Sequence, residues 1–241
     1  MNKNITSTKF SFIEKTLAWS VHLFTASGLV SGFMAILAIN TQDWRSAMLW
    51  LVLCLIIDGV DGTFARIFRV KEVLPYINGQ TIDYVIDFAT YAIIPAYFFH
   101  EAQLVDEAWR LPCTSIILLV SALYYGKEGM VSDDMYFVGF PVMWNMVILY
   151  MVFVVDLSPI LNALVILFFA ILHFVPIKFV YPSQAKSFRT LTLTVTVIFI
   201  LTLIGILWFY PERKLSLIVS AILTASFYAI MAIYNTWIEK E

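Results

Sequence analysis

Long apolar stretches dominate the hydrophobic pattern, and short segments between them hold most of the charged residues. Each stretch is about 20 residues long, enough for a helix rising about 1.5 Å per residue to cross about 30 Å of bilayer hydrocarbon. The apolar character is continuous rather than alternating, which favours helices over the strands of a membrane barrel. The pattern therefore predicts an all-α, polytopic membrane helix bundle with about eight transmembrane helices. The predicted helices cover 17–39, 46–69, 79–100, 111–126, 136–155, 158–179, 189–209 and 214–238.

Composition supports a membrane protein. Of the 241 residues, 61% are hydrophobic, which is more than a water-soluble core of this size needs, and only 13% are charged. The net charge of −2 comes with no basic tract, so we expect no nucleic-acid partner. The two cysteines, Cys54 and Cys113, lie in different predicted helices and form neither a disulfide framework nor a metal-cluster spacing. Without a linker or an internal repeat, residues 1–241 are expected to form one domain.

The distribution of Lys and Arg predicts the orientation in the membrane. With an even number of helices, both termini lie on one side, and the positive-inside rule makes that side the cytoplasm. Of the 15 Lys and Arg residues, 11 fall on the side of the termini and four on the other. The connection between the helices at 46–69 and 79–100 is then cytoplasmic. The 11 are Lys3, Lys9, Lys15, Arg66, Arg69, Lys71, Lys127, Lys178, Lys186, Arg189 and Lys240, and the four are Arg45, Arg110, Arg213 and Lys214.

Four aspartates lie in or beside apolar helices. Asp58 and Asp61 are spaced i, i+3, and Asp83 and Asp87 are spaced i, i+4, so each pair projects from one face of its helix. A charged residue at the bilayer centre costs at least about 2.5 to 3.5 kcal/mol, so such residues face a bundle interior and usually serve a function. An antiparallel arrangement of the two helices would bring both pairs to one depth.

Carboxylates gathered in this way predict a metal site. Oxygen ligands suit hard divalent cations such as Mg²⁺, Mn²⁺ or Ca²⁺, and no His or Cys cluster favours zinc. Two cations around a phosphoryl group stabilise both the attacking and the leaving oxygen. Gly59, Gly62 and Gly79 fit this interpretation, because a helix surface without Cβ atoms admits a ligand or another helix.

The spacing Asp58-x-x-Asp61-Gly62-x-x-Ala65-Arg66, followed by Gly79-x-x-x-Asp83-x-x-x-Asp87, resembles the signature of the CDP-alcohol phosphotransferase family. Every fixed position of that signature is filled over about 30 residues, and the Arg66 to Gly79 gap is at the long end for the family. The family has members that are often dimers, so the resemblance also suggests a homodimer.

The resemblance implies a role for each residue. The metal ligands would be Asp58, Asp61, Asp83 and Asp87, holding two ions of Mn²⁺ or Mg²⁺. Asp83 and Asp87 would be the catalytic pair, with Asp87 completing the second metal site or taking the proton of the acceptor alcohol. The CDP-lipid would be received by Gly62, Ala65, Arg66, Gly79 and Thr25. His22, one turn before Thr25, is more simply read as a packing residue.

Within the family, chain length, helix number and the region from Tyr124 to Asn145 look most like the bacterial phosphatidylcholine synthases. This resemblance implies CDP-diacylglycerol and choline as substrates, in the bacterial inner (cytoplasmic) membrane, with membrane lipid around the protein and the site facing the cytoplasm. A quaternary ammonium cannot donate hydrogen bonds, so a choline site needs aromatic faces and a nearby carboxylate. We expect these from Tyr124, Tyr125, Glu128 and Trp144, although aromatic residues are also common at membrane interfaces.

Two alternatives stay open. The first is the same chemistry with serine, inositol or glycerol phosphate as the acceptor. The second is a cation or proton transporter, which would also use intramembrane carboxylates. The transporter does not account for Ala65, Arg66 and the spaced glycines that accompany the acids, and the sequence shows no inverted repeat.

Overall fold

A computed structural model describes residues 10–182 and 188–238, and in this part of the chain helices dominate. Six of them are long and apolar enough to cross a membrane, so the protein is a multi-pass membrane helix bundle. The predicted fold class is confirmed. The elements in chain order are α1 (Phe12–Asn40), α2 (Trp44–Ile67), α3 (Val70–Val73), α4 (Gly79–Asp87), η1 (Phe88–Ile93), α5 (Ile94–Glu101), α6 (Glu107–Tyr125), β1 (Tyr136–Val138), α7 (Trp144–Leu149), η2 (Tyr150–Val154), α8 (Pro159–Leu172), β2 (Lys178–Val180), α9 (Arg189–Phe209) and α10 (Leu215–Trp237).

Polar caps set where the helices near the aspartates begin. Ser11 and Glu14 form a capping box, with each side chain accepting from the other residue's backbone N–H, and α1 therefore starts before the predicted position 17. Asn78 caps α4 by accepting from the Thr81 N–H at 3.2 Å. Between α2 and α4 the chain turns at Arg69, which has a left-handed backbone with φ of 50°.

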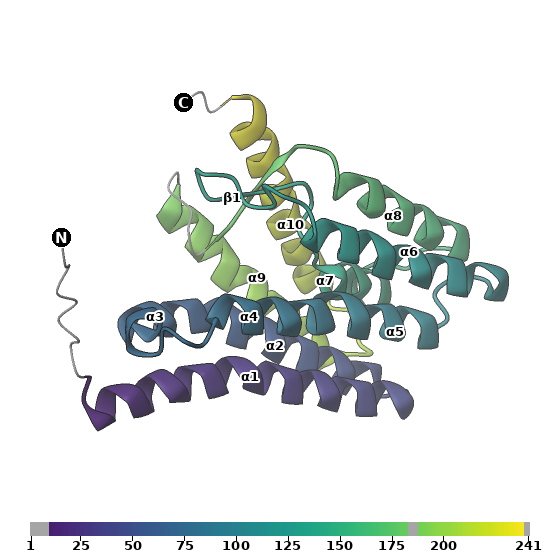
Figure 1. Cartoon of the computed structure of the whole chain (residues 1–241). Coiled ribbons are helices and arrows are strands. Elements are labelled where there is room, and N and C mark those ends of the chain that lie inside the picture. The colour runs from purple at the N-terminus through teal and green to yellow at the C-terminus, as the bar shows by residue number, and fades with distance from the viewer. Residues whose placement is uncertain (1–9, 183–187, 239–241) are drawn as a thin grey trace.

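The helix that starts at Gly79 continues without a break to Glu101. Its middle part, η1, is a π-helical segment between α4 and α5, and Pro95 is the second residue of α5. A π-helical turn inserts one residue and changes which side chains face the bundle, and such turns are frequent at functional sites. Figure 1 shows α4 and α5 in one line above α1, with α2 beside them.

Two of the eight predicted helices are shorter than expected. The span 136–155 contains strand β1, a loop and then the 11 apolar helical residues Trp144–Val154, and the span 158–179 contains α8 and strand β2. Gly139, with φ of +92°, and Pro141 keep the first of these segments from being helical throughout. The apolar composition predicted a lipid-spanning helix, but here it fills the protein core: every residue of α7 is buried.

Strands β1 and β2 form a two-stranded antiparallel sheet, here called the β-ribbon, with Phe137 opposite Phe179. The ribbon closes the α7–η2–α8 segment, so the chain leaves and returns on the same side of the bundle. The pairing of β1 with β2 is compatible with the even number of crossings that the predicted orientation requires, and that number stays a prediction. Cytoplasmic termini stay a prediction, and four of its cations, Lys3, Lys9, Lys186 and Lys240, lie outside the described residues.

Candidate active site

The aspartates come together between the C-terminal half of α2 and α4. One carboxylate oxygen from each of Asp58, Asp83 and Asp87 lies within 4.8 Å of the other two. All three side chains are half-buried, whereas Asp61 is buried at 7% exposure. The two acidic helix faces therefore lie together, as their spacing in the sequence predicts.

The distances allow this trio to hold a divalent cation. Two oxygens bound to one Mg²⁺ ion lie at most about 4.2 Å apart, twice the metal–oxygen distance of about 2.1 Å, and about 5 Å apart for Ca²⁺. A separation of up to 4.8 Å therefore needs an inward movement of a few tenths of an ångström for Mg²⁺. Among the described residues none of the four aspartates forms an ion pair, so a bound cation would supply the missing positive charge.

Two tyrosine hydroxyls lie beside this trio, one at Asp58 and one at Asp87. Tyr91, in η1, donates its hydroxyl to Asp58 Oδ2 at 2.8 Å and is itself buried. Tyr125, at the end of α6, lies with its hydroxyl next to Asp87. Hydrogen bonds of this kind orient metal-ligating carboxylates. Sequence reasoning did not find Tyr91, although it lies four residues after Asp87.

Asp61 faces α1. The predicted ligand-binding residue Thr25 is buried on α1, with its side chain interacting with the Asp61 carboxylate. A Cβ placed on Gly28, one turn further along α1, would lie 3.2 Å from the Ile86 side chain. This distance shows how closely α1 approaches α4. Asp61 does not belong to the trio that one cation would hold.

A polar cavity of about 80 Å³ opens beside the aspartates. The Arg66 guanidinium, from the last turn of α2, lies on its wall and donates to Thr63 Oγ1 at 3.0 Å. A Cβ added at Gly59 would meet no atom within 4 Å, so this part of the wall is open. The lining residues are Asp58, Gly59, Asp61, Gly62, Thr63, Arg66, Asp83 and Tyr181.

The other predicted CDP-lipid residues lie near this cavity but do not line it. Ala65 packs into an apolar cluster with Ala18 and Val21 of α1 and with α3. Gly79 touches the His22 ring, whose Cε1 would be 3.2 Å from a Cβ at that position. His22 is buried and its Nε2 has no hydrogen-bond partner among the described residues.

The predicted choline residues lie in three different places. Tyr125 lies at the aspartates, with ring contacts to Tyr84 and Phe88 at centroid distances of 5.9 and 5.8 Å. Tyr124 and Trp144 lie in the core instead. The Trp144 Nε1 donates to Ser121 Oγ at 2.9 Å, and both rings pack against His173. Glu128 is exposed in the loop after α6.

Tyr181 reaches the cavity from the far end of the β-ribbon. Its ring stacks on Phe137 of β1, with centroids 4.7 Å apart and planes 29° apart. Burial and the nearby carboxylates, Asp58 and Asp83 ahead of Asp87 and Asp61, raise the pKa of Tyr181 to about 12, so its phenol stays protonated at neutral pH. No local signal in the sequence connects Tyr181 to the aspartates, because the tertiary structure alone brings β2 over α2.

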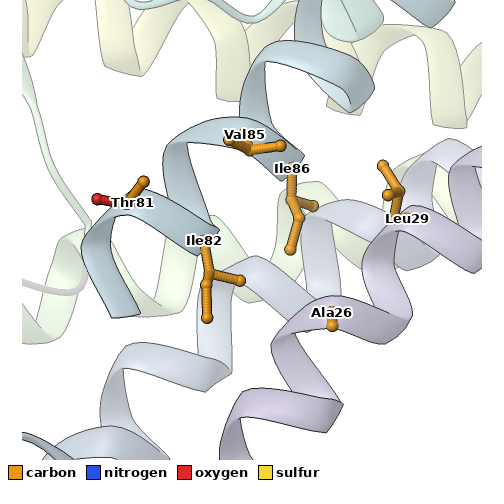
Figure 2. A pocket seen from close by; sticks show the side chains of 6 residues that line it. All are labelled: Ala26, Leu29, Thr81, Ile82, Val85 and Ile86. Atoms are coloured by element: carbon orange, nitrogen blue, oxygen red, sulfur yellow. The ribbon is translucent and has the colours of Figure 1, made fainter. Parts of the chain in front are cut away.

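A second hollow, of about 270 Å³, lies between α1 and α4 (Figure 2). Its α4 residues, Thr81, Ile82, Val85 and Ile86, occupy helix positions other than those of the aspartates, and Ala26 and Leu29 come from α1. The wall is almost entirely apolar, so this groove offers no group for chemistry.

Comparisons with known proteins agree with this arrangement. No family model matches the chain. The phosphatidylcholine synthase of Rhizobium johnstonii is 36% identical over 217 residues, covering 90% of this chain and 89% of that protein. Those of Pseudomonas aeruginosa and Rhizobium meliloti are 39% and 40% identical, covering 79% and 73% of this chain and the same shares of their own lengths. With this identity over most of both sequences, the chain belongs to the phosphatidylcholine synthase family of enzymes.

Proposed function

We propose that this enzyme transfers the phosphatidyl group of CDP-diacylglycerol to choline and releases CMP. The observation that carries the proposal is the convergence of Asp58, Asp83 and Asp87 beside a polar cavity that also contains Arg66. Acids without ion-pair partners together with a guanidinium suit a substrate that brings both phosphates and divalent cations. The family relationship supports the same reaction.

The donor set is made of oxygens, which is the set preferred by Mg²⁺ and Mn²⁺. We assign one ion to the trio Asp58, Asp83 and Asp87, and a second to Asp61 together with a shared carboxylate. Cations held there would neutralise charge on the phosphoryl oxygens of the substrate. Asp58 is oriented for this role by the hydroxyl of Tyr91.

The chain's own residues then perform three tasks. Arg66 binds the diphosphate through charge-assisted hydrogen bonds, and the bare surface at Gly59 and Gly62 lets the substrate approach α2 closely. Asp87 accepts the proton of the acceptor hydroxyl. The hydroxyl oxygen forms a bond to the phosphorus nearest diacylglycerol, the bond from that phosphorus to the bridging oxygen breaks, and CMP leaves with the electron pair.

For the acceptor we propose choline. Tyr125 is the predicted choline residue that the structure brings to Asp87, and the rings of Tyr84 and Phe88 lie beside it. Aromatic faces next to carboxylates attract a quaternary ammonium. For Tyr124 and Trp144 the buried contacts support a packing role, and a choline contact from Glu128 stays a prediction.

The setting of the reaction is also part of the proposal. Arg66, in the last turn of α2, and Tyr181, directly after β2, line one cavity, so the connections that follow them open on the same side of the bundle. We infer that this side is the cytoplasmic face of the bacterial inner membrane, where a soluble alcohol reaches the cavity. A homodimer is proposed from the family resemblance alone.

The proposed function is tested with detergent-purified protein, CDP-diacylglycerol and Mn²⁺, by following CMP release and the lipid product with choline, serine, inositol or glycerol phosphate. We expect phosphatidylcholine and CMP with choline, and no release from Asp83→Asn or Asp87→Asn. Glu14→Gln, which removes an exposed carboxylate of the α1 capping box, is the control that keeps turnover. CMP release with a different alcohol, and not with choline, would identify that alcohol as the acceptor. Absence of release with every alcohol would reject phosphatidyl transfer and favour the transporter.

A further inference from the structure

We propose that the ring of Tyr181, held over the aspartates by the β-ribbon, is the surface on which the quaternary ammonium of the acceptor packs, so that Tyr181 selects the alcohol. This inference rests on the proposed phosphatidyl transfer. Tyr181 is the one aromatic residue among the described residues that line the polar cavity. The remaining lining residues are acids, glycines, a threonine and an arginine.

A recognition surface has to be held in place before the ligand arrives. One ring contact holds Tyr181, and several contacts hold the β-ribbon that it follows. Its ring is stacked on Phe137, which pairs with Phe179 in the ribbon. The ribbon is tied to α10 by the Lys178 N–H, which donates to Thr236 Oγ1 at 2.8 Å. An ion pair of 2.6 Å joins Lys178 to Asp134. Pre-organisation of this kind reduces the entropy lost when a ligand binds.

The chemistry of the cavity favours a cation beside Tyr181. A quaternary ammonium donates no hydrogen bonds, and it binds best between an aromatic face and a negative charge. Tyr181 offers the face, and the carboxylates of Asp58, Asp61 and Asp83 line the same cavity. Arg66 and Thr63 lie on α2 and bond to each other, and they supply the donors that a diphosphate needs.

The length of the acceptor agrees with this placement. In an amino alcohol of this kind two carbons separate the hydroxyl from the nitrogen. A hydroxyl that gives its proton to Asp87 therefore keeps the ammonium close to Asp87, and the two trio partners of Asp87, Asp58 and Asp83, line the cavity together with Tyr181. Tyr125 lies on the α6 side of Asp87, and Tyr181 covers the cavity from the β-ribbon.

The test compares Tyr181→Leu, Tyr181→Phe and the wild-type enzyme with choline and ethanolamine as acceptors. For Tyr181→Leu we expect a KM for choline about 10-fold higher, with the KM for CDP-diacylglycerol unchanged, because one cation–aromatic contact of about 1.4 kcal/mol is lost. The preference for choline over ethanolamine in kcat/KM should fall by a similar factor. Tyr181→Phe keeps the ring and should keep the preference. Tyr76→Leu, at an exposed tyrosine in the α3–α4 connection, is the matched control.

Fluorinated phenylalanines at position 181 test the same contact without changing the shape of the ring. Each added fluorine weakens the negative face of the ring, so the KM for choline should rise stepwise with the number of fluorines. A KM for choline that does not respond to fluorination, or a rise in the KM for CDP-diacylglycerol instead, overturns the assignment. Wild-type enzyme that releases no CMP with choline would reject the proposed function itself, which distinguishes the two failures.

Discussion

Removing the Tyr91 hydroxyl tests whether the hydrogen bond to Asp58 supports metal binding. In Tyr91→Phe the ring keeps its place in η1, while Asp58 Oδ2 loses a donor at 2.8 Å. Tyr91 is 5% exposed, so water cannot readily replace the hydroxyl. We expect Asp58 to become a weaker and less well-oriented ligand.

The size of the effect follows from the charge on Asp58. A hydrogen bond to a charged group contributes about 1.5 to 3 kcal/mol, and loss of an outer partner of a metal ligand lowers metal affinity by roughly 10- to 100-fold. The Mn²⁺ concentration that gives half of the maximal CMP release should therefore rise by about one to two orders of magnitude. At saturating Mn²⁺ the rate should return close to that of the wild type, because the proton acceptor Asp87 is unchanged.

The assay is a Mn²⁺ titration of CMP release at saturating CDP-diacylglycerol and choline. Tyr97→Phe is the matched control, since the Tyr97 hydroxyl donates to Asn40 instead of an aspartate. An unchanged Mn²⁺ requirement in Tyr91→Phe would refute the support of Asp58 by this hydroxyl. A low rate that Mn²⁺ does not restore would instead show that the hydroxyl acts in the reaction.

Three further predictions follow from the same geometry. Gly139→Ala should lower the free energy of unfolding in detergent by at least about 3 kcal/mol, because its Cβ would lie 2.0 Å from the His173 carbonyl oxygen. Gly129→Ala, also at positive φ but with no atom within 4 Å of the new Cβ, should lose only about 1 kcal/mol. Equal losses in the two variants would contradict the predicted clash. Gly59→Ala should keep the melting temperature yet raise the KM for CDP-diacylglycerol, because the new Cβ meets no protein atom but enters the cavity. An unchanged KM would mean that the substrate does not approach this wall. EDTA should abolish CMP release and lower the melting temperature of the wild type, and added Mn²⁺ should restore both. In Asp83→Asn, Mn²⁺ should restore neither. A rise in melting temperature with Mn²⁺ that is as large in Asp83→Asn as in the wild type would contradict metal binding at the trio.

Local helix geometry explains why the acidic site was predictable. Spacings of three and four residues place Asp58 with Asp61, and Asp83 with Asp87, on single helix faces whatever the rest of the chain does. The cost of carboxylates in lipid then requires that both faces turn inward, where they meet. The length of the apolar runs likewise determined the six long helices.

The segments that were predicted wrongly show where such reasoning ends. Apolar residues in 136–155 and 158–179 have the composition of lipid-spanning helices. In the structure α7 and most of η2 are buried in the core, the β-ribbon takes residues from both spans, and α8 is shorter than predicted but exposes much of its apolar surface. Hydrophobicity reports removal from water and does not distinguish lipid from protein interior. The rings of Tyr124 and Trp144 pack against His173 in the core, and their contact with choline stays a prediction.

The sequence by itself determined a membrane bundle and the position of its four carboxylates, because both depend on residues close together along the chain. The tertiary structure decided what surrounds those carboxylates. It directs the Tyr91 hydroxyl to Asp58 through the π-helical segment η1, and it brings Tyr181 from the β-ribbon over the cavity. These contacts join segments far apart in sequence, and their pairing is fixed by the packing of the whole bundle rather than by any local pattern.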